Sequence, residues 1–128
     1  MIAVDTNILV RIFVDDLDHA QIEKARNLAQ KAKHIYIAQI VLAELVWVLT
    51  RAYQLTKAQI CCILQELLDN SAFIIEQEQQ FLEALITFKE NNTDFSDCLI
   101  LAETKAAGIE HIYTFDAKFS RLKSVKKL

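Results

Sequence analysis

The segment IAVDTNILVRIFV, residues 2–14, decides the fold, because it changes from a strand pattern to a helix pattern at one polar junction. Its first three residues form a short apolar run that predicts a strand, and its last seven predict an amphipathic helix. Asp5 follows the strand directly, with Thr6 and Asn7 after it. Ligands of open α/β sheets bind outside the carboxyl ends of the strands, which favours chemistry at Asp5. The alternative is that Asp5 or Thr6 caps the helix, since both residue types are preferred caps.

The remainder of the chain alternates strand and helix patterns. Further strands are expected where β-favouring side chains gather, at residues 34–38, 72–75 and 111–115. Apolar residues with roughly the 3.6-residue period of a helix predict helices at 18–33, 40–53, 56–70, 78–91 and 95–107. Strands separated by helices of this length pair in parallel through right-handed crossovers. The sequence therefore predicts an α/β fold.

Several polar residues mark the expected helix ends. Thr56 followed by Gln59 fits a capping box, and Asp18 followed by Gln21 is a weaker version of the same pattern. Gly108 is the only glycine, and it stands where the helix at 95–107 needs a C-terminal cap.

Length and composition indicate one domain, residues 1–128, with a hydrophobic fraction of 53% that suffices for a core. No apolar run reaches the length of a membrane span. Met1 leads straight into the first expected strand, so we expect no signal peptide. Three cysteines, two of them adjacent, form neither a disulfide framework nor a zinc pattern. We therefore expect a cytoplasmic protein with reduced thiols, and Cys98 as a buried core thiol.

Charge is unevenly distributed, although the formal net charge is only −3. Eleven acidic residues between Glu66 and Asp116 face only two lysines, whereas the last eleven residues hold five basic ones. A basic tail beside an acidic site would let phosphates approach a metal centre. A solvated, fraying C-terminus is the alternative.

Other carboxylates are expected at the same sheet edge as Asp5. Glu44 lies in an otherwise apolar helix, so we expect its charge to be poorly solvated and to serve a site; an ion pair with Arg51 or Arg11 is the alternative. Asp116 follows the last expected strand, where it could also cap a short helix.

Asp94 and Asp97 lie one turn apart at the start of the helix at 95–107. We expect Asp94 to cap this helix and Asp97 to be the better metal ligand. Two unit charges about 4 Å apart repel by about 4 kcal/mol at an effective dielectric near 20. A cluster of carboxylates therefore needs protons, solvent or a divalent cation.

Four segments in this order resemble the PIN-domain ribonucleases: Val4–Asn7, Glu44 in its apolar helix, Asp94–Ile100 and Thr114–Asp116. Within these, the chain is most similar to the VapC-like toxins of bacterial toxin and antitoxin pairs. The resemblance runs from Ile2 to about Leu122. It implies a three-layer sandwich in which helices cover both faces of a central, mostly parallel sheet of four or five strands.

The resemblance also implies a carboxylate pocket that binds Mg²⁺ or Mn²⁺ and hydrolyses RNA. Asp5 and Asp97 would be its primary ligands, and the secondary ones would be Glu44, Asp116 and Asp94. Bound metal would acidify a water and align an in-line displacement. The polar residues that match ligand-orienting positions are Thr6, Asn7 and Thr114, and the candidate RNA contacts in the basic tail are Lys118, Arg121 and Lys123.

Two partners besides RNA are implied, namely a second copy of the chain and a cognate antitoxin that inserts a basic side chain among the carboxylates. The apolar residues that would form the dimer face and the antitoxin groove are Ile8, Ile12, Phe13, Val46 and Trp47. Ordinary core packing is the alternative for each of them.

Two other functional classes remain open. A phosphohydrolase of the haloacid dehalogenase type would use Asp5 as a nucleophile, but that pattern has a second aspartate where Asn7 stands. A catalytically silent module would only receive a basic partner in its acidic cleft.

Overall fold

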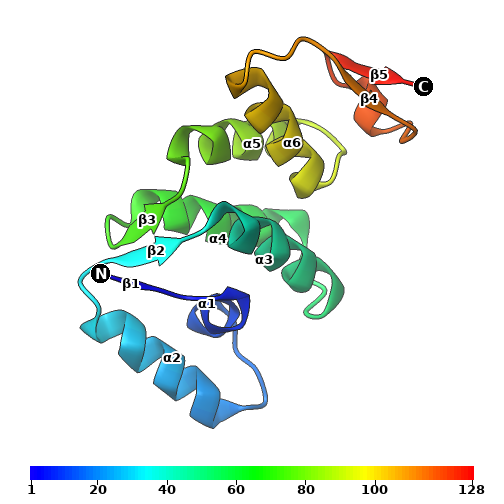
Figure 1. Cartoon of the computed structure of the whole chain (residues 1–128). Coiled ribbons are helices and arrows are strands. Elements are labelled where there is room, and N and C mark those ends of the chain that lie inside the picture. Colours follow the sequence, from blue (N-terminus) through cyan, green and yellow to red (C-terminus); the bar gives the residue numbers. More distant parts are fainter. The chain divides into compact units, whose positions relative to one another are not determined.

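The computed structural model describes all of residues 1–128, which form two compact units, Met1–Glu78 and Gln79–Leu128. The elements follow one another in the order β1 (Ile2–Ala3), α1 (Thr6–Phe13), α2 (His19–Lys31), β2 (Ile35–Ile37), α3 (Gln39–Arg51), α4 (Lys57–Asp69), β3 (Phe73–Ile75), α5 (Glu78–Glu90), α6 (Phe95–Ala106), β4 (Ile112–Thr114), the 3-10 helix η1 (Phe119–Arg121) and β5 (Val125–Lys127) (Figure 1). This alternation confirms the predicted α/β class.

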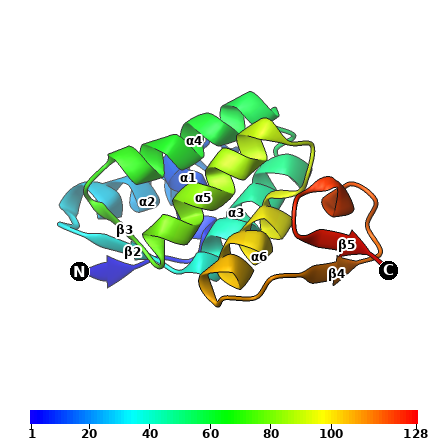
Figure 2. The same cartoon turned by 90° about the horizontal axis from the view of Figure 1, so that it is seen from above.

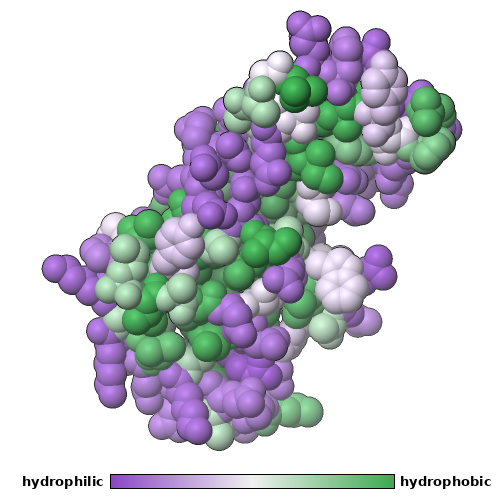
Figure 3. Space-filling view, in the orientation of Figure 1, coloured by the Kyte–Doolittle hydropathy of each residue, from purple (hydrophilic) through white to green (hydrophobic).

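In the first unit, β1, β2 and β3 form a parallel sheet in that order, with Ile35 paired to Ile2 on one side and Phe73 on the other. Both crossovers step in the same direction, so right-handed connections place their helices on one face. Figure 2 shows α1 to α4 on the same side of the strands. Ile35 and Phe73 are buried, whereas Ile74, which alternates with Phe73, is 38% exposed. In Figure 3, apolar surface lies over these three strands.

Helix packing fixes the junction that carries Asp5. Helix α1 contacts both α2 and α3 and buries Leu9 and Val10 completely or nearly so. Phe13, at its end, packs against Phe73 with ring centroids 5.8 Å apart. The Tyr53 hydroxyl donates to Asp16 and thereby ties the loop after α1 to the end of α3. This hydrogen bond is the largest cause of the lowered pKa of Asp16.

The second unit has two apolar clusters. Phe95, at the start of α6, packs edge-on against two rings of α5, with centroid separations of 5.9 Å to Phe81 and 5.5 Å to Phe88. The cluster between α6 and the C-terminal segment contains Leu101, Phe119, Leu122 and Val125, with Ile112 against it. The predicted burial of Cys98 is confirmed, with the side chain 1% exposed.

The caps predicted at Thr56, Asp18 and Gly108 are confirmed. Thr56 and Gln59 form the complete capping box, and Asp18 accepts a hydrogen bond from the Gln21 amide at 3.1 Å. Gly108 follows the end of α6 with φ of 78°, a left-handed conformation that favours glycine. None of the helices is both long and apolar enough to cross a membrane.

The chain has five strands, within the predicted four or five, and every pairing is parallel. Two parallel sheets are present, β1-β2-β3 in the first unit and β4-β5 in the second. The C-terminal lysines do not fray, because Val125 to Lys127 pair with Ile112 to Thr114 as the unexpected strand β5. This pairing joins segments that are adjacent through η1, and a run of lysines gives no period-two signal for it.

Candidate functional site

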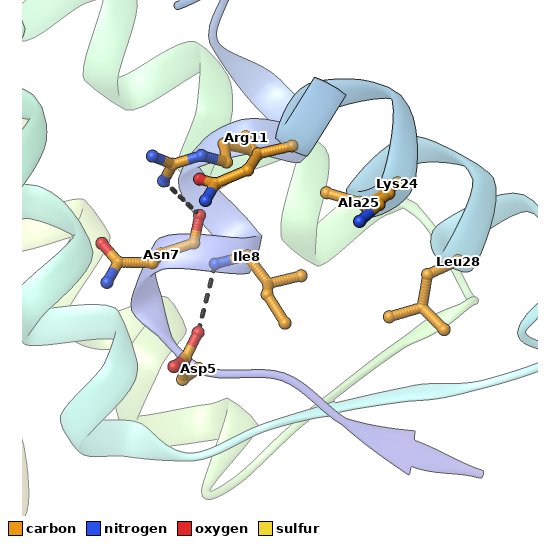
Figure 4. Close-up of a pocket in the computed structure, with 8 residues that line it drawn as sticks. Asp5, Asn7, Ile8, Arg11, Lys24, Ala25 and Leu28 are labelled. Atoms are coloured by element: carbon orange, nitrogen blue, oxygen red, sulfur yellow. Dashed lines mark hydrogen bonds between the residues drawn. The ribbon is translucent and has the colours of Figure 1, made fainter. Parts of the chain in front are cut away.

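Asp5 begins α1 and serves as its N-cap. Its Oδ1 accepts a hydrogen bond from the Ile8 amide at 3.1 Å, and the residue is exposed (Figure 4). A carboxylate has two oxygens, so this cap leaves Oδ2 free for a cation. Capping and metal ligation were alternatives for Asp5 in the sequence, and the geometry makes them compatible.

Thr6 and Asn7 occupy the first turn of α1. Thr6 is buried, at 9% exposure, whereas Asn7 is exposed. The Asn7 carbonyl oxygen accepts a hydrogen bond from Nη1 of Arg11 at 3.2 Å. This bond fastens the turn that follows Asp5.

Glu44 is exposed, which corrects the expectation that its charge would be poorly solvated. It forms no ion pair with Arg51 or Arg11; the Arg51 guanidinium lies 5.8 Å from the centre of the Trp47 ring. Helix α3 is apolar on nearly all sides, and it buries only the face that contains Val41, Leu42, Leu45, Val46 and Leu49. Glu44 shares the open face with Ile40 and Trp47, which are 68% and 62% exposed.

Glu76, which directly follows β3, holds the start of α3. Its carboxylate accepts hydrogen bonds from the Gln39 amide at 3.0 Å and from the Tyr36 hydroxyl at 2.9 Å. These bonds, the amide first, lower the pKa of Glu76. The preceding residue, Ala38, has no side chain to cap the helix, so Glu76 supplies the cap from another strand. Sequence reasoning missed this residue, although it follows a strand as Asp5 does.

The second unit contains three of the predicted carboxylate ligands, Asp94, Asp97 and Asp116. Burial raises the pKa of the Asp97 carboxyl above its ordinary value of 3.8, and the negative charges of Asp94 and Asp116 raise it further. Asp94 occupies the N-cap position of α6, but its side chain makes no capping hydrogen bond. The predicted side-chain cap is therefore absent, and the Asp94 carboxylate adds its charge to the cluster.

Asp116 is held by the turn that follows β4. Its Oδ1 accepts hydrogen bonds from the amides of Lys118 at 2.8 Å and Phe119 at 3.1 Å, so Asp116 holds the turn before η1, whose N-cap residue is Lys118. The Thr114 hydroxyl accepts a hydrogen bond from the Asp116 amide at 3.0 Å, so Thr114 orients the backbone that carries the Asp116 carboxylate. As with Asp5, one oxygen, Oδ2, stays free.

The predicted ligands are divided between the units, with Asp5 and Glu44 in the first and Asp94, Asp97 and Asp116 in the second. Neither unit by itself holds three His, Cys, Asp or Glu side chains in a group that could hold a metal ion. The chemistry of the donors nevertheless fits a hard cation, since all are carboxylates. The pKa of the Asp97 carboxyl is raised first by burial and then by its negative neighbours.

Basic and aromatic residues surround Asp116 in the chain. The predicted RNA contacts are all exposed: Lys118, Arg121 and Lys123. Three further residues of this surface were not predicted from the sequence. Tyr113 and Phe115 are 64% and 78% exposed, and Lys126 pairs with Tyr113 in the β4-β5 register. Only the strand pairing reveals that an aromatic and a cation lie side by side here.

The apolar residues expected to form partner surfaces differ in burial. Val46 is buried, and the half-buried residues are Ile8, Ile12 and Phe13. Trp47 alone among the five is exposed. Val46 is therefore part of the core, whereas the Trp47 side chain lies on the exposed face of α3.

Comparison with known proteins gives three findings. A VapC ribonuclease of Aquifex aeolicus (strain VF5) is 26% identical over 95 residues, which cover 74% of this chain and 70% of that protein. The crystal structure of VapC20 from Mycobacterium tuberculosis, a sarcin-ricin loop cleaving toxin, is similar over 94% of both chains, with 23% identity and a TM-score of 0.46. The family model of the PIN domain matches residues 2–125. Because that match extends over nearly the whole sequence, as the resemblance of its four segments led us to expect, this chain belongs to the PIN domain family.

Proposed function

We propose that this protein is a metal-dependent endoribonuclease that hydrolyses RNA phosphodiester bonds and acts as the toxin of a toxin and antitoxin pair. The observation that carries the proposal is the proximity of three carboxylates in the second unit: Asp97 is partly buried, and the negative charges of Asp94 and Asp116 act on it. Such a cluster favours a divalent ion. Membership of the PIN domain family and similarity to a VapC ribonuclease support the reaction.

We assign Mg²⁺ or Mn²⁺ as the ion and residues 1–128 as one nuclease domain. Asp5 and Asp97 are the proposed primary ligands, and Glu44, Asp116 and Asp94 are secondary. When bound, the ion would lower the pKa of a water and stabilise charge on the phosphoryl oxygens. The protein's part is positioning: backbone amides fix one oxygen of Asp5 and of Asp116, so the other oxygen is presented in a defined direction. Thr6, Asn7 and Thr114 secure the turns that carry these two carboxylates.

We further propose that single-stranded RNA passes over the β4-β5 sheet. Tyr113 offers an exposed ring on which a base can stack, and Lys126 beside it can contact a phosphate. The other cations near Asp116 are Lys118, Arg121 and Lys123. An unpaired region of RNA suits this surface, because its bases are free to leave their stack.

The partners we propose are a cognate antitoxin and a second copy of the chain. The open face of α3, with Ile40 and Trp47 exposed beside Glu44, supports a protein contact there. We place the protein in the cytoplasm, where its three cysteines, none of which forms a disulfide, would stay reduced.

The test is cleavage of single-stranded RNA with Mg²⁺ or Mn²⁺, followed by mapping of the fragment ends. Asp5→Asn and Asp97→Asn should each lower the rate by at least about 100-fold, the upper end of what loss of a metal's outer-shell partner costs. Lys105→Ala, on the exposed end of α6, is the matched control and should cleave normally. A folded wild type that cuts no RNA with either ion would refute the proposal, and an acyl phosphate trapped on Asp5 would favour a phosphohydrolase instead.

A further inference from the structure

The first unit has a cavity of about 500 Å³ beside Asp5, between α1 and α2. Figure 4 shows Asp5 at one end and Arg11 at the other, with Lys24, Ala25 and Leu28 contributed by α2. Ligand pockets span roughly 300 to 1,000 Å³, so the space suffices for a nucleotide.

The lining combines two cations with a single carboxylate, that of Asp5. Lys24 is exposed and forms no ion pair. Arg26, on the same helix, has partners within the fold: it forms an ion pair with Asp15 at 3.0 Å and donates a hydrogen bond to the Arg11 carbonyl at 3.1 Å. The charge of Lys24 therefore takes part in no ion pair of the fold and is available to a ligand.

Only some of the hydrogen-bond donors of the Arg11 guanidinium have partners. Nη1 donates to the Asn7 carbonyl, whereas Nε is buried and has no hydrogen-bond partner. A buried donor without a partner destabilises the fold. Arg11 also helps to lower the pKa of Asp16, but as the smallest cause, and that carboxylate is hydrogen-bonded to Tyr53. A phosphate that drew the guanidinium toward the cavity could bind it through two parallel hydrogen bonds.

Apolar side chains form the rest of the wall. Ile8 is half-buried, Ala25 is buried, and Leu28 is 39% exposed on the cavity side shown in Figure 4. An inorganic anion would gain nothing from these contacts, whereas the flat face of a base would cover them.

We propose that this cavity binds one nucleotide of the RNA next to the phosphate that is cut, with Arg11 and Lys24 on its phosphate and Ile8 and Leu28 against its base. The inference rests on the proposed ribonuclease function, because Asp5 is shared between the cavity and the proposed metal site. Arg11 and Lys24 bind the substrate and do not touch the reacting atoms, so their loss should raise KM and leave kcat nearly unchanged.

The experiment measures RNA binding separately from cleavage. Lys24→Ala and Arg11→Met are made in the Asp97→Asn background, and fluorescence anisotropy follows a labelled single-stranded oligoribonucleotide over a series of salt concentrations. Each variant should weaken binding and lower the slope of log K against log salt by about 0.7, the value for one phosphate contact on a single strand. Leu28→Ala should weaken binding without a change in slope. Lys31→Ala, exposed on the same helix but outside the cavity, should match the parent.

Both parts of the proposal can fail. If Lys24→Ala and Arg11→Met keep the parent affinity and slope, the cavity holds no RNA phosphate and is left to a protein partner. In amide NMR of the wild type, a nucleoside monophosphate should shift signals at Ile8, Lys24 and Leu28. Equal shifts with inorganic phosphate alone would overturn the assignment of a base site. Binding changes in a protein that cuts no RNA would instead refute the ribonuclease function and keep the nucleotide site.

Discussion

Phe95 offers the sharpest test of how the fold positions Asp97. The ring is 2% exposed at the first position of α6, two residues before Asp97, and meets Phe81 and Phe88 at interplanar angles of 78° and 84°. Edge-to-face pairs contribute about 0.5–1.5 kcal/mol each beyond the area they bury. Phe95→Leu should therefore cost about 2 kcal/mol more than a Phe→Leu change without ring partners.

Phe119→Leu is the matched control, because Phe119 is 4% exposed in the other apolar cluster of the same unit and forms no ring contact. For a chain of this length, 1 kcal/mol corresponds to roughly 3–5 °C in Tm, so Phe95→Leu should melt about 6–10 °C below Phe119→Leu. Circular dichroism gives both values, and urea titration gives the free energies of unfolding. Equal losses in the two variants would show that the ring pairs do not hold the start of α6.

Three further predictions concern stability. Glu76→Gln should lower Tm at pH 7, because the Gln39 amide depresses the pKa of Glu76 below its ordinary 4.5. The stabilisation by Glu76 is therefore present above pH 4.5 and is lost as the pH falls through the folded pKa; a Tm difference that does not shrink as the pH is lowered below 4.5 would contradict this. Asp97→Asn should raise the Tm of the metal-free protein at pH 7 but not below pH 3.8. The folded pKa of Asp97 is raised, so the native state is favoured while Asp97 is protonated and loses this stability as the pH rises through that pKa. An unchanged Tm at pH 7 would contradict this reasoning. Thr56→Ala should cost about 1 kcal/mol in urea titration, because it breaks the capping box of α4.

Local patterns in the sequence were enough for the element order and for most helix ends. The caps at Asp18, Thr56 and Gly108 depend on neighbours three residues away or fewer, so the sequence contains all of their partners. The position of Asp5 after β1 follows from the same local change of pattern. These features could be predicted because their physical causes are local.

Features set by distant segments could not be predicted. The exposure of Glu44 depends on which face of a nearly uniformly apolar helix the rest of the fold covers, and periodicity cannot select a face when residues on every side are apolar. Glu76 reaches its partners Gln39 and Tyr36 across adjacent strands. The basic strand β5 owes its existence to β4 and to the cluster around Phe119, not to its own composition.

Holding a turn and binding a metal ion are compatible roles for Asp5 and Asp116. Backbone amides bind one carboxylate oxygen of each residue, and the other oxygen remains available to a metal ion. The two roles can be separated by the choice of substitution. Asparagine caps a helix about as well as aspartate, whereas alanine does not, so Asp→Asn removes the charge and keeps the turn. A structural role alone would leave the asparagine variant active and the alanine variant impaired. If the carboxylate charge is what the reaction requires, both variants are inactive while only the alanine variant loses stability, by about 1 kcal/mol.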